Sequence, residues 1–316
     1  MAAETHASGG ARPHPAGCST RSAANVLPGS LGLGNGDWID ESAGKEQTKG
    51  KVDFEWDDDY VALEVLNPDG EFWIRRMNEA THEKVDPKEG ERILDIGCGR
   101  AVDGVDLAKR GAVVIGLEPS NVMIARAKSH IAENGVHMAV IWGVGEHLPF
   151  RPQSLDKVVC KGALDHFVDP AMVMQQMAMA LKPEGKAIIS IANFGSLGFK
   201  LGKGIWWLMR LVGFKDGGVR MPWEPPSDHT YRFDYALLKR MASSHLEVEQ
   251  ATGASLLFGV PWWGSLLAKC PQRLCHVILI TLDRIAQVLP SLSDVVVLRC
   301  RPSNGGPTLV QGTSAS

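Results

Sequence analysis

The sequence lacks an excess of positive charge and any long apolar run. Its 33 lysines and arginines stand against 36 aspartates and glutamates, which gives a formal net charge of −3. Without a basic field the chain is poorly suited to hold a nucleic acid, so we expect no nucleic-acid substrate. No stretch approaches the roughly 18 unbroken apolar residues of a membrane span, and the first residues contain no apolar block of a signal peptide. These absences favour a soluble protein.

Paired cysteines are also missing. None of the six cysteines stands in the C-x-x-C spacing of many zinc and redox sites, and Cys98 and Cys160 fall at the ends of expected strands. We therefore expect neither a disulfide framework nor a metal site. Unpaired thiols persist in a reducing compartment, which favours a cytoplasmic protein.

Large apolar side chains are scarce in residues 1–50, which are rich in glycine, alanine, serine, proline and threonine. This composition cannot offset the entropy lost on ordering, and it predicts a disordered tail. A transit peptide is the alternative because acids are scarce here as well, although Arg12 and Arg21 supply little positive charge.

Strand-like apolar runs alternate with segments of helical spacing through the rest of the chain. Such alternation predicts right-handed crossovers and a Rossmann-like, doubly wound α/β fold, with a mostly parallel sheet covered on both faces. Ligands in that fold bind at the carboxyl ends of the strands. The expected strands lie at 92–96, 112–117, 138–142, 156–160, 186–192, 246–251 and 294–300. The expected parts of the chain are a disordered tail at 1–50, a helical cap at 51–90, the main domain at 91–301 and a flexible tail at 302–316.

Several residues mark the ends of the expected helices. Gly135 is typical of a residue that follows a helix, and Lys182-Pro183-Glu184-Gly185 separates a helix at 171–181 from the fifth strand. Asp234 can cap another helix. A further helix is expected at 271–289. Its apolar face should consist of Leu274, Ile278, Leu282 and Ile285.

The most informative stretch joins the first two strands. The first strand ends close to Asp95, a turn follows at Gly97-Cys98-Gly99, and the second strand ends at Glu118. The glycines permit a tight turn in which a ligand approaches the backbone and the N-terminus of the next helix. A dinucleotide fingerprint requires a third glycine where this chain has Val102. The turn is therefore of a nucleotide-binding type without the complete dinucleotide pattern.

Asp95 decides which ligand suits this turn. Its carboxylate would lie within several ångströms of any phosphate that the turn held. Two like charges about 4 Å apart repel by roughly 4 kcal/mol at an effective dielectric near 20, which disfavours a pyrophosphate. An ammonium and a sulfonium would be attracted instead, while Glu118 can accept hydrogen bonds from two ribose hydroxyls. A ribose and a cation without phosphate describe S-adenosylmethionine; the alternative is that both acids only cap the helices that follow.

Two motifs and two later blocks match a known family. The motifs are Leu94-Asp95-Ile96-Gly97-Cys98-Gly99 and Gly116-Leu117-Glu118-Pro119-Ser120, and the blocks lie at 143–150 and 154–167. Over about residues 90–192 the chain resembles the class I S-adenosylmethionine-dependent methyltransferases. Within them it is most similar to the branch that methylates small molecules such as quinone precursors. The resemblance implies a seven-stranded sheet whose last strand inserts antiparallel beside the sixth.

The resemblance also assigns residues to the cofactor. Where the family commonly has an acid that binds adenine, this chain has Val144, so adenine recognition falls to the backbone of Val144 and Gly145, helped by Glu146. Lys161 stands where the family's backbone passes under the methionine and the sulfonium. The residues expected to bind S-adenosylmethionine are Asp95, Gly97, Cys98, Gly99, Glu118, Pro119, Val144, Gly145, Glu146 and Lys161.

His166 is the candidate catalytic residue. It follows the fourth strand, close to the expected position of the methyl group, and an imidazole can act as a general base for an oxygen or carbon nucleophile. The alternative is that it packs against the next helix and supports the site. The segment Cys160-Lys161-Gly162-Ala163 replaces the Asn/Asp-Pro-Pro-aromatic motif that would hold a planar amine. Methylation of a nucleobase or amide nitrogen is thereby disfavoured.

Two insertions, at 194–226 and 254–290, are rich in large apolar side chains. Ordinary packing of added helices is the simplest interpretation. A second is a hydrophobic lid over the substrate, and a third is peripheral contact with a membrane surface, because lysines and arginines flank the first tryptophan pair. The acidic run at 57–59 beside Trp56 is expected to be a solvated face, with a cap over the cofactor pocket as the alternative. The expected substrate contacts are Trp206, His229, Tyr231 and Trp262.

Together these features predict an enzyme that transfers a methyl group from S-adenosylmethionine to an oxygen or carbon of a small, partly hydrophobic metabolite. Two alternatives are a dinucleotide-dependent oxidoreductase and a non-catalytic protein that binds S-adenosylmethionine. The sequence indicates neither the acceptor nor an oligomeric state.

Overall fold

The computed structural model describes residues 52, 54–58, 67–213, 221–224 and 229–303. The tail predicted at 1–50 lies outside these residues, as does the tail predicted at 302–316 apart from its first two residues. In the part of the chain described here, no helix combines the length and the apolar character needed to cross a bilayer.

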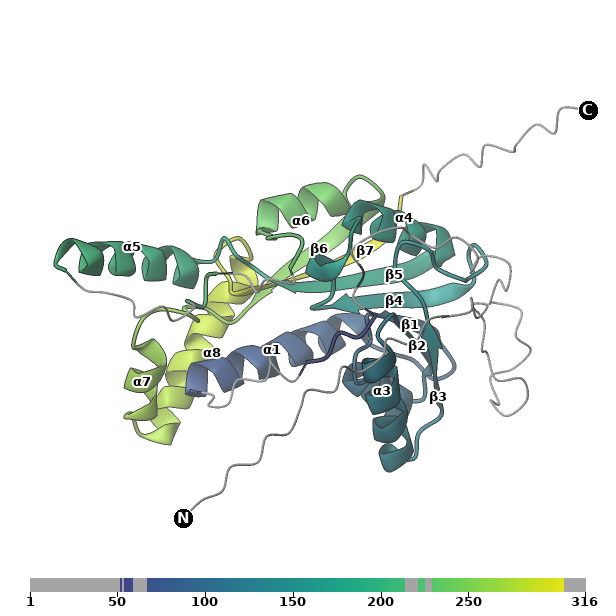
Figure 1. Ribbon diagram of the computed structural model, residues 1–316, viewed down its shortest axis with the longest axis horizontal. Helices are drawn as coiled ribbons and strands as arrows, with labels where there is room; N and C mark the ends of the chain where they lie inside the picture. The colour runs from purple at the N-terminus through teal and green to yellow at the C-terminus, as the bar shows by residue number, and fades with distance from the viewer. Residues whose placement is uncertain (1–51, 53, 59–66, 214–220, 225–228, 304–316) are drawn as a thin grey trace, which may run out of the picture.

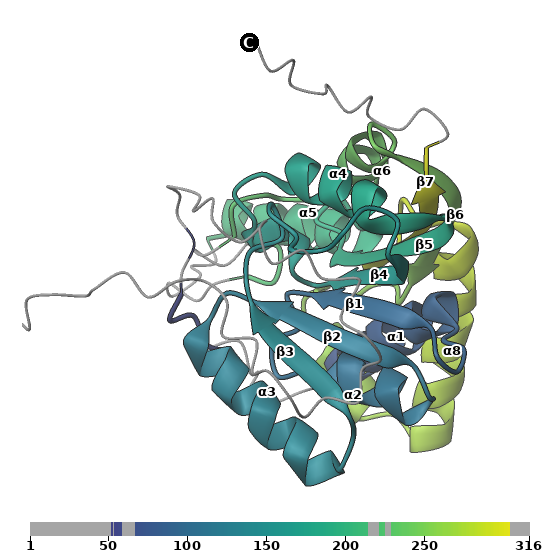
Figure 2. The ribbon, with the colours of Figure 1, turned by 90° about the vertical axis from the view of Figure 1, so that its right-hand side faces the viewer.

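A seven-stranded sheet forms the centre of the molecule, in the order β3-β2-β1-β4-β5-β7-β6 (Figure 2). Neighbouring strands from β3 to β5 pair in parallel, whereas β7 runs antiparallel to both β5 and β6. This confirms the expected doubly wound sheet and the antiparallel insertion of its last strand. The strands are β1 (Arg92–Ile96), β2 (Val113–Glu118), β3 (Met138–Trp142), β4 (Leu155–Lys161), β5 (Leu181–Ala192), β6 (Leu246–Ala254) and β7 (Val295–Pro302).

Helices cover both faces of the sheet (Figures 1 and 2). One apolar core packs α1, α2 and α3 against the sheet, and a second packs α4 and α6 against its other face. The two predicted insertions supply α5, α7 and α8, of which α8 packs on β6. The helices are α1 (Pro68–Val85), α2 (Val102–Lys109), α3 (Asn121–Asn134), α4 (Pro170–Ala180), α5 (Leu197–Leu211), α6 (Tyr235–Ala242), α7 (Trp263–Ala268) and α8 (Gln272–Val288).

Two of the expected helix ends are confirmed and one boundary is wrong. Gly135 ends α3 with a φ of +62°, and the Asp234 side chain accepts a hydrogen bond from the Leu237 N–H at the start of α6. The segment Lys182–Gly185, however, is part of β5 and does not precede it. Leu181 pairs with Leu155 of β4, and this pairing extends the strand through the proline and glycine.

The predicted apolar face of α8 is also wrong, by one residue around the helix. Leu274 and Ile285 are 50% and 42% exposed. The inward positions are Cys275, Leu279, Asp283 and Ala286. The buried face includes a charged residue, Asp283, which forms an ion pair with Arg76 of α1. A prediction from apolar spacing alone therefore misses this face.

This ion pair belongs to a polar network that joins the second insertion to the rest of the fold. The Arg76 Nε lies 3.0 Å from Asp283 Oδ2, and Asp283 Oδ1 accepts a hydrogen bond from the Ser255 N–H at 2.9 Å. The Ser255 hydroxyl in turn donates to buried Asp294, which precedes β7. Burial raises the pKa of Asp294 to about 7. These contacts fix the loop after β6 although Ser255 has a positive φ of 58°.

We expect Arg76→Ala to lower the free energy of unfolding by about 3 to 5 kcal/mol, because it leaves Asp283 buried without its counter-ion. Arg75, the preceding residue, has a half-exposed side chain whose Nη1 atom lies 3.9 Å from Glu79 Oε1. Arg75→Ala should therefore cost less than about 1 kcal/mol. Urea unfolding of both variants measures the difference, and equal losses would show that the buried pair contributes no more than a surface one.

Candidate functional site

The turn after β1 is fixed by close approach on two sides. Gly97 and Gly99 have positive φ values of 67° and 52°. A Cβ atom on Gly97 would lie 2.5 Å from the Ala163 Cβ, so the chain after β4 leaves no room for a side chain there. The N–H groups of Gly97 and Cys98 both donate to the Leu117 carbonyl, at 2.8 and 3.2 Å. The turn is therefore held against the ends of β2 and β4.

Glu118 lies at the end of β2 and faces this turn. One of its carboxylate oxygens accepts a hydrogen bond from the Gly99 N–H at 2.9 Å, and the other accepts one from the Ser120 N–H at 3.0 Å. The cap of α3 is Ser120, whose hydroxyl accepts from the Met123 N–H, so the capping interpretation of Glu118 is wrong. Burial raises the pKa of Glu118. Each oxygen keeps an unused lone pair with which to accept a bond from a ribose hydroxyl.

Asp95 is 3% exposed, and its Oδ2 atom has no hydrogen-bond partner among the described residues. The capping interpretation also fails here, because the residue before α2 is Ala101. Burial is the largest cause that raises the pKa of Asp95, and the neighbouring charge of Asp103 raises it further. A buried carboxylate oxygen without a partner at the end of a parallel strand fits the ammonium group of a methionine moiety.

The side chain of Lys161 is engaged by α1 and α2, and contact of its backbone with the cofactor stays a prediction. Its Nζ atom lies 2.6 Å from Asp103 Oδ2 and 2.5 Å from Asn78 Oδ1, and His82 Nε2 lies 2.8 Å from the other oxygen of Asp103. The side chain of Lys161 thus joins α1 and α2 to the end of β4. The sequence analysis missed Asp103 and His82, since only the tertiary contact between α1 and α2 brings them beside β4.

Glu146 anchors the chain that follows β4. Its Oε1 atom accepts hydrogen bonds from the N–H groups of Val168 and Asp169, at 2.9 and 3.2 Å. A Cβ atom on Gly145 would come within about 3.2 Å of both the Phe167 ring and the Ile96 side chain. The segment around Val144 is therefore packed tightly beside the turn. Contact of these residues with adenine stays a prediction.

Residues 54–58 cross the carboxyl end of the sheet. The Trp56 carbonyl accepts a hydrogen bond from the Ser120 hydroxyl, and the Trp56 ring lies edge-on to His166 with 5.6 Å between ring centroids. Asp58 forms ion pairs with both Arg100 and Arg126. Partial burial opposes these pairs, yet the arginines lower the pKa of Asp58. The expectation of a solvated acidic face is thus wrong for Asp58, whereas Asp59 lies outside the described residues.

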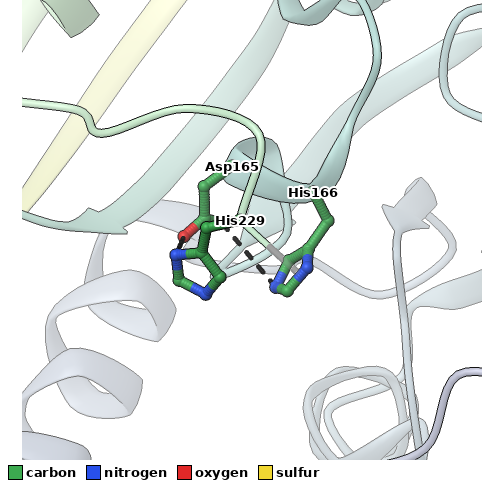
Figure 3. A group of neighbouring side chains, drawn as sticks. All are labelled: Asp165, His166 and His229. Carbon is green, nitrogen blue, oxygen red and sulfur yellow. Dashed lines mark ion pairs between the residues drawn. The ribbon is translucent and has the colours of Figure 1, made fainter. Parts of the chain in front are cut away.

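Asp165, His166 and His229 meet beside this segment (Figure 3). His229 Nδ1 lies 2.8 Å from Asp165 Oδ2, an ion-pair distance at which the ring is not yet aligned for a hydrogen bond. His166 Nε2 lies 4.0 Å from Asp165 Oδ1, and the two imidazole centroids are 4.7 Å apart. One nitrogen or oxygen from each residue lies within 4.8 Å of the others, so the group could also hold a metal ion.

The backbone keeps this group together. The Asp165 carbonyl accepts a hydrogen bond from the Thr230 N–H at 2.8 Å, which brings the chain before α6 against the short helical turn after β4. Tyr231 stacks on Phe233, with 5.8 Å between ring centroids, and packs on the core. The sequence analysis named Asp165 only as part of a motif, because nothing in the sequence places it beside His229.

Trp206 and Trp262 lie in a different place. Both line a cavity of about 460 Å³, together with Trp223, Phe258 and the start of α1. The lining residues of this cavity include neither His229 nor Tyr231. The four expected substrate contacts are therefore divided between two places.

Part of the chain is similar in sequence to known methyltransferases. A family model described as a methyltransferase domain matches residues 87–199. A ubiquinone biosynthesis O-methyltransferase from Klebsiella pneumoniae is 34% identical over 125 residues, which covers 39% of this chain and 48% of that protein. One from Aeromonas salmonicida is 33% identical over 141 residues, covering 44% of this chain and 56% of that protein.

These matches show a methyltransferase domain at residues 87–199. The match covers about half the length of these curated relatives. Among solved structures, the YcgJ protein from Bacillus subtilis aligns with 72% of this chain and 99% of its own, at 18% identity and a TM-score of 0.47.

We expect Asp95→Asn to separate ligand binding from stability. The folded state raises the pKa of Asp95 above its ordinary 3.8. Its contribution to stability is thus present below the ordinary pKa and is lost as the pH rises toward the raised value. Near neutral pH the amide should raise the free energy of unfolding by at least about 1 kcal/mol. It should also weaken S-adenosylhomocysteine binding by about 1 to 3 kcal/mol.

Urea unfolding and calorimetry measure the two effects. Glu184→Gln is the matched control, because Glu184 is exposed near the start of β5, at the opposite edge of the sheet. It should change neither quantity. Unchanged ligand affinity of Asp95→Asn would show that Asp95 does not face the cofactor.

Proposed function

We propose that the protein transfers a methyl group from S-adenosylmethionine to an oxygen or carbon of a small, partly hydrophobic metabolite. The observation that carries this proposal is the pair of buried acids at the ends of β1 and β2. Asp95 has an unused carboxylate oxygen and Glu118 has unused lone pairs, and both face the same turn. The curated relatives, whose printed names are those of O-methyltransferases, support an oxygen acceptor.

When bound, the cofactor supplies a methyl group that its positive sulfur already activates. The protein mainly needs to align the acceptor with that group, and orientation can lower the barrier by roughly 7 to 11 kcal/mol. Asp95 would hold the amino group of the methionine part, and Glu118 would hold the ribose. The segment at 54–58 lies across the carboxyl end of the sheet and helps to exclude water from this region.

His229 is the side chain best placed to accept the proton of an acceptor hydroxyl. Asp165 Oδ2 lies 2.8 Å from its Nδ1, so Nε2 is directed away from the carboxylate and is able to take a proton. Asp165 then stabilises the imidazolium. His166, predicted from the sequence as the base, lies farther from Asp165 and contacts both Trp56 and His229. We propose that His166 positions the acceptor beside His229.

The two alternative functions are less well supported. A dinucleotide would place its phosphates against the buried and unpaired carboxylate of Asp95, which disfavours the oxidoreductase. A non-catalytic binding protein would have no need of the Asp165–His229 pair. We also propose a cytoplasmic location, which the five described cysteines support because all of them are free thiols.

Ligand preference tests the proposal. S-adenosylhomocysteine should raise the melting temperature of the protein, whereas NAD should not, because only the former lacks phosphate beside Asp95. Incubation with S-adenosylmethionine and a metabolite extract should then release S-adenosylhomocysteine. Stabilisation by NAD would favour the oxidoreductase, and cofactor binding without release in any extract would favour the binding protein.

We expect His229→Ala to lower kcat by about 100-fold to 1,000-fold while cofactor affinity stays unchanged, because it removes the proton acceptor. His166→Ala should lower kcat by less than about tenfold. Asp165→Asn should also lower kcat, since the imidazolium loses its counter-charge. Steady-state kinetics measure all three.

A larger loss of kcat for His166→Ala than for His229→Ala would show that His166, and not His229, acts as the base. A chelator provides the second control. If chelation abolished turnover and an added divalent cation restored it, the three residues would be metal ligands and the proposed proton transfer to His229 would be wrong.

A further inference from the structure

The helix α5 leaves much of its apolar surface uncovered. It extends away from the sheet in Figure 1, and Trp207, Leu208 and Leu211 are 65%, 59% and 64% exposed. These residues and Leu201, one and two helical turns apart, form a stripe along the helix. Large apolar side chains gathered on one face, as opposed to scattered singly, mark an interaction surface.

A second group of exposed apolar side chains lies on the other insertion. Trp262 and Leu266, at the start of α7, are 61% and 56% exposed. Trp206 of α5 and Trp262 line the same cavity, so the two insertions meet there. We call the two exposed groups together the α5–α7 surface. It consists of Leu201, Trp207, Leu208, Leu211, Trp262 and Leu266.

The charged side chains of the two segments that carry this surface are all basic. Residues 194–213 contain Lys200, Lys203 and Arg210 and no acid, and residues 254–276 contain Lys269 and Arg273 and no acid. The whole chain, by contrast, has more acids than lysines and arginines. Asp69 is the one acid that lines the adjoining cavity, and it is buried. Basic side chains beside tryptophans and leucines are typical of helices that lie in the headgroup region of a membrane.

We propose that the α5–α7 surface docks the protein on bilayers that carry anionic headgroups. The surface does not cross the bilayer, because no described helix is suited to do so. A second copy of the chain is a poorer occupant, since a contact between two copies of this basic surface would bring like charges together and supply no counter-charge. Anionic lipids supply both the apolar layer for the tryptophans and the counter-charge for the lysines.

Flotation with vesicles tests this proposal without any need for turnover, so its outcome is independent of the proposed activity. The full chain should float with vesicles of phosphatidylcholine and phosphatidylserine and not with phosphatidylcholine alone. Added salt should weaken the binding because it screens the headgroups. Failure to float with the anionic vesicles would overturn the proposal, and equal binding to neutral vesicles would overturn its electrostatic part.

Paired variants locate the contact. Trp207→Ser with Leu208→Ser should reduce the partition constant by about tenfold or more, since two large side chains no longer enter the bilayer. Lys200→Glu with Lys203→Glu should reduce it at least about tenfold on anionic vesicles. The matched controls are Val288→Ser, at the exposed end of α8, and Lys128→Glu, on α3.

The controls should bind as the unaltered protein does. Each variant should also keep its thermal stabilisation by S-adenosylhomocysteine, which shows that it is folded. Equal losses in the controls would show that the binding is not confined to the α5–α7 surface. A dimer in light scattering that Trp207→Ser with Leu208→Ser dissociates, without any vesicle binding, would assign the surface to a second copy.

Discussion

Burial of a carboxylate oxygen without a hydrogen-bond partner is costly, and among the described residues Asp95 Oδ2, at the end of β1, is such an atom. Asp95 sits under a turn whose glycines are required by their backbone angles and by the approach of Ala163. The backbone of the turn is bonded to the end of β2, and Glu118 accepts hydrogen bonds from the N–H groups of Gly99 and Ser120. The fold therefore holds a carboxyl group with an unpaired oxygen in a fixed place, and a cationic ligand would favour its charged form.

The polar groups near Asp95 fall into two sets with different roles. His82, Asp103 and Lys161 pair with one another and join α1 and α2 to β4, and they thereby support the turn. Asp165 and His229 lie beyond the end of β4 and contact each other. In the proposed function, the first set supports the turn that would hold the cofactor and the second set acts on the acceptor.

The insertions combine firm attachment with exposed apolar surface. The buried pair of Arg76 and Asp283 and the contacts of Ser255 attach the second insertion to α1 and β7. Phe199 and Leu267 are buried, as the packing interpretation predicts, whereas Trp207 and Trp262 are largely exposed. Of the interpretations considered for these segments, packing therefore describes their inner faces, and membrane contact is our proposal for their outer faces.

The sequence by itself determined the positions of the strands along the chain, the turn after β1 and the acids that flank it, because these features are local and follow from residue spacing. It also misplaced the buried face of α8, since an ion pair with a distant arginine overrides apolar periodicity. Tertiary structure alone decided that Lys161 binds Asp103, that Asp165 meets His229, and that Trp206 lies apart from both histidines. Each of these contacts joins residues far apart along the chain, where spacing carries no information about distance.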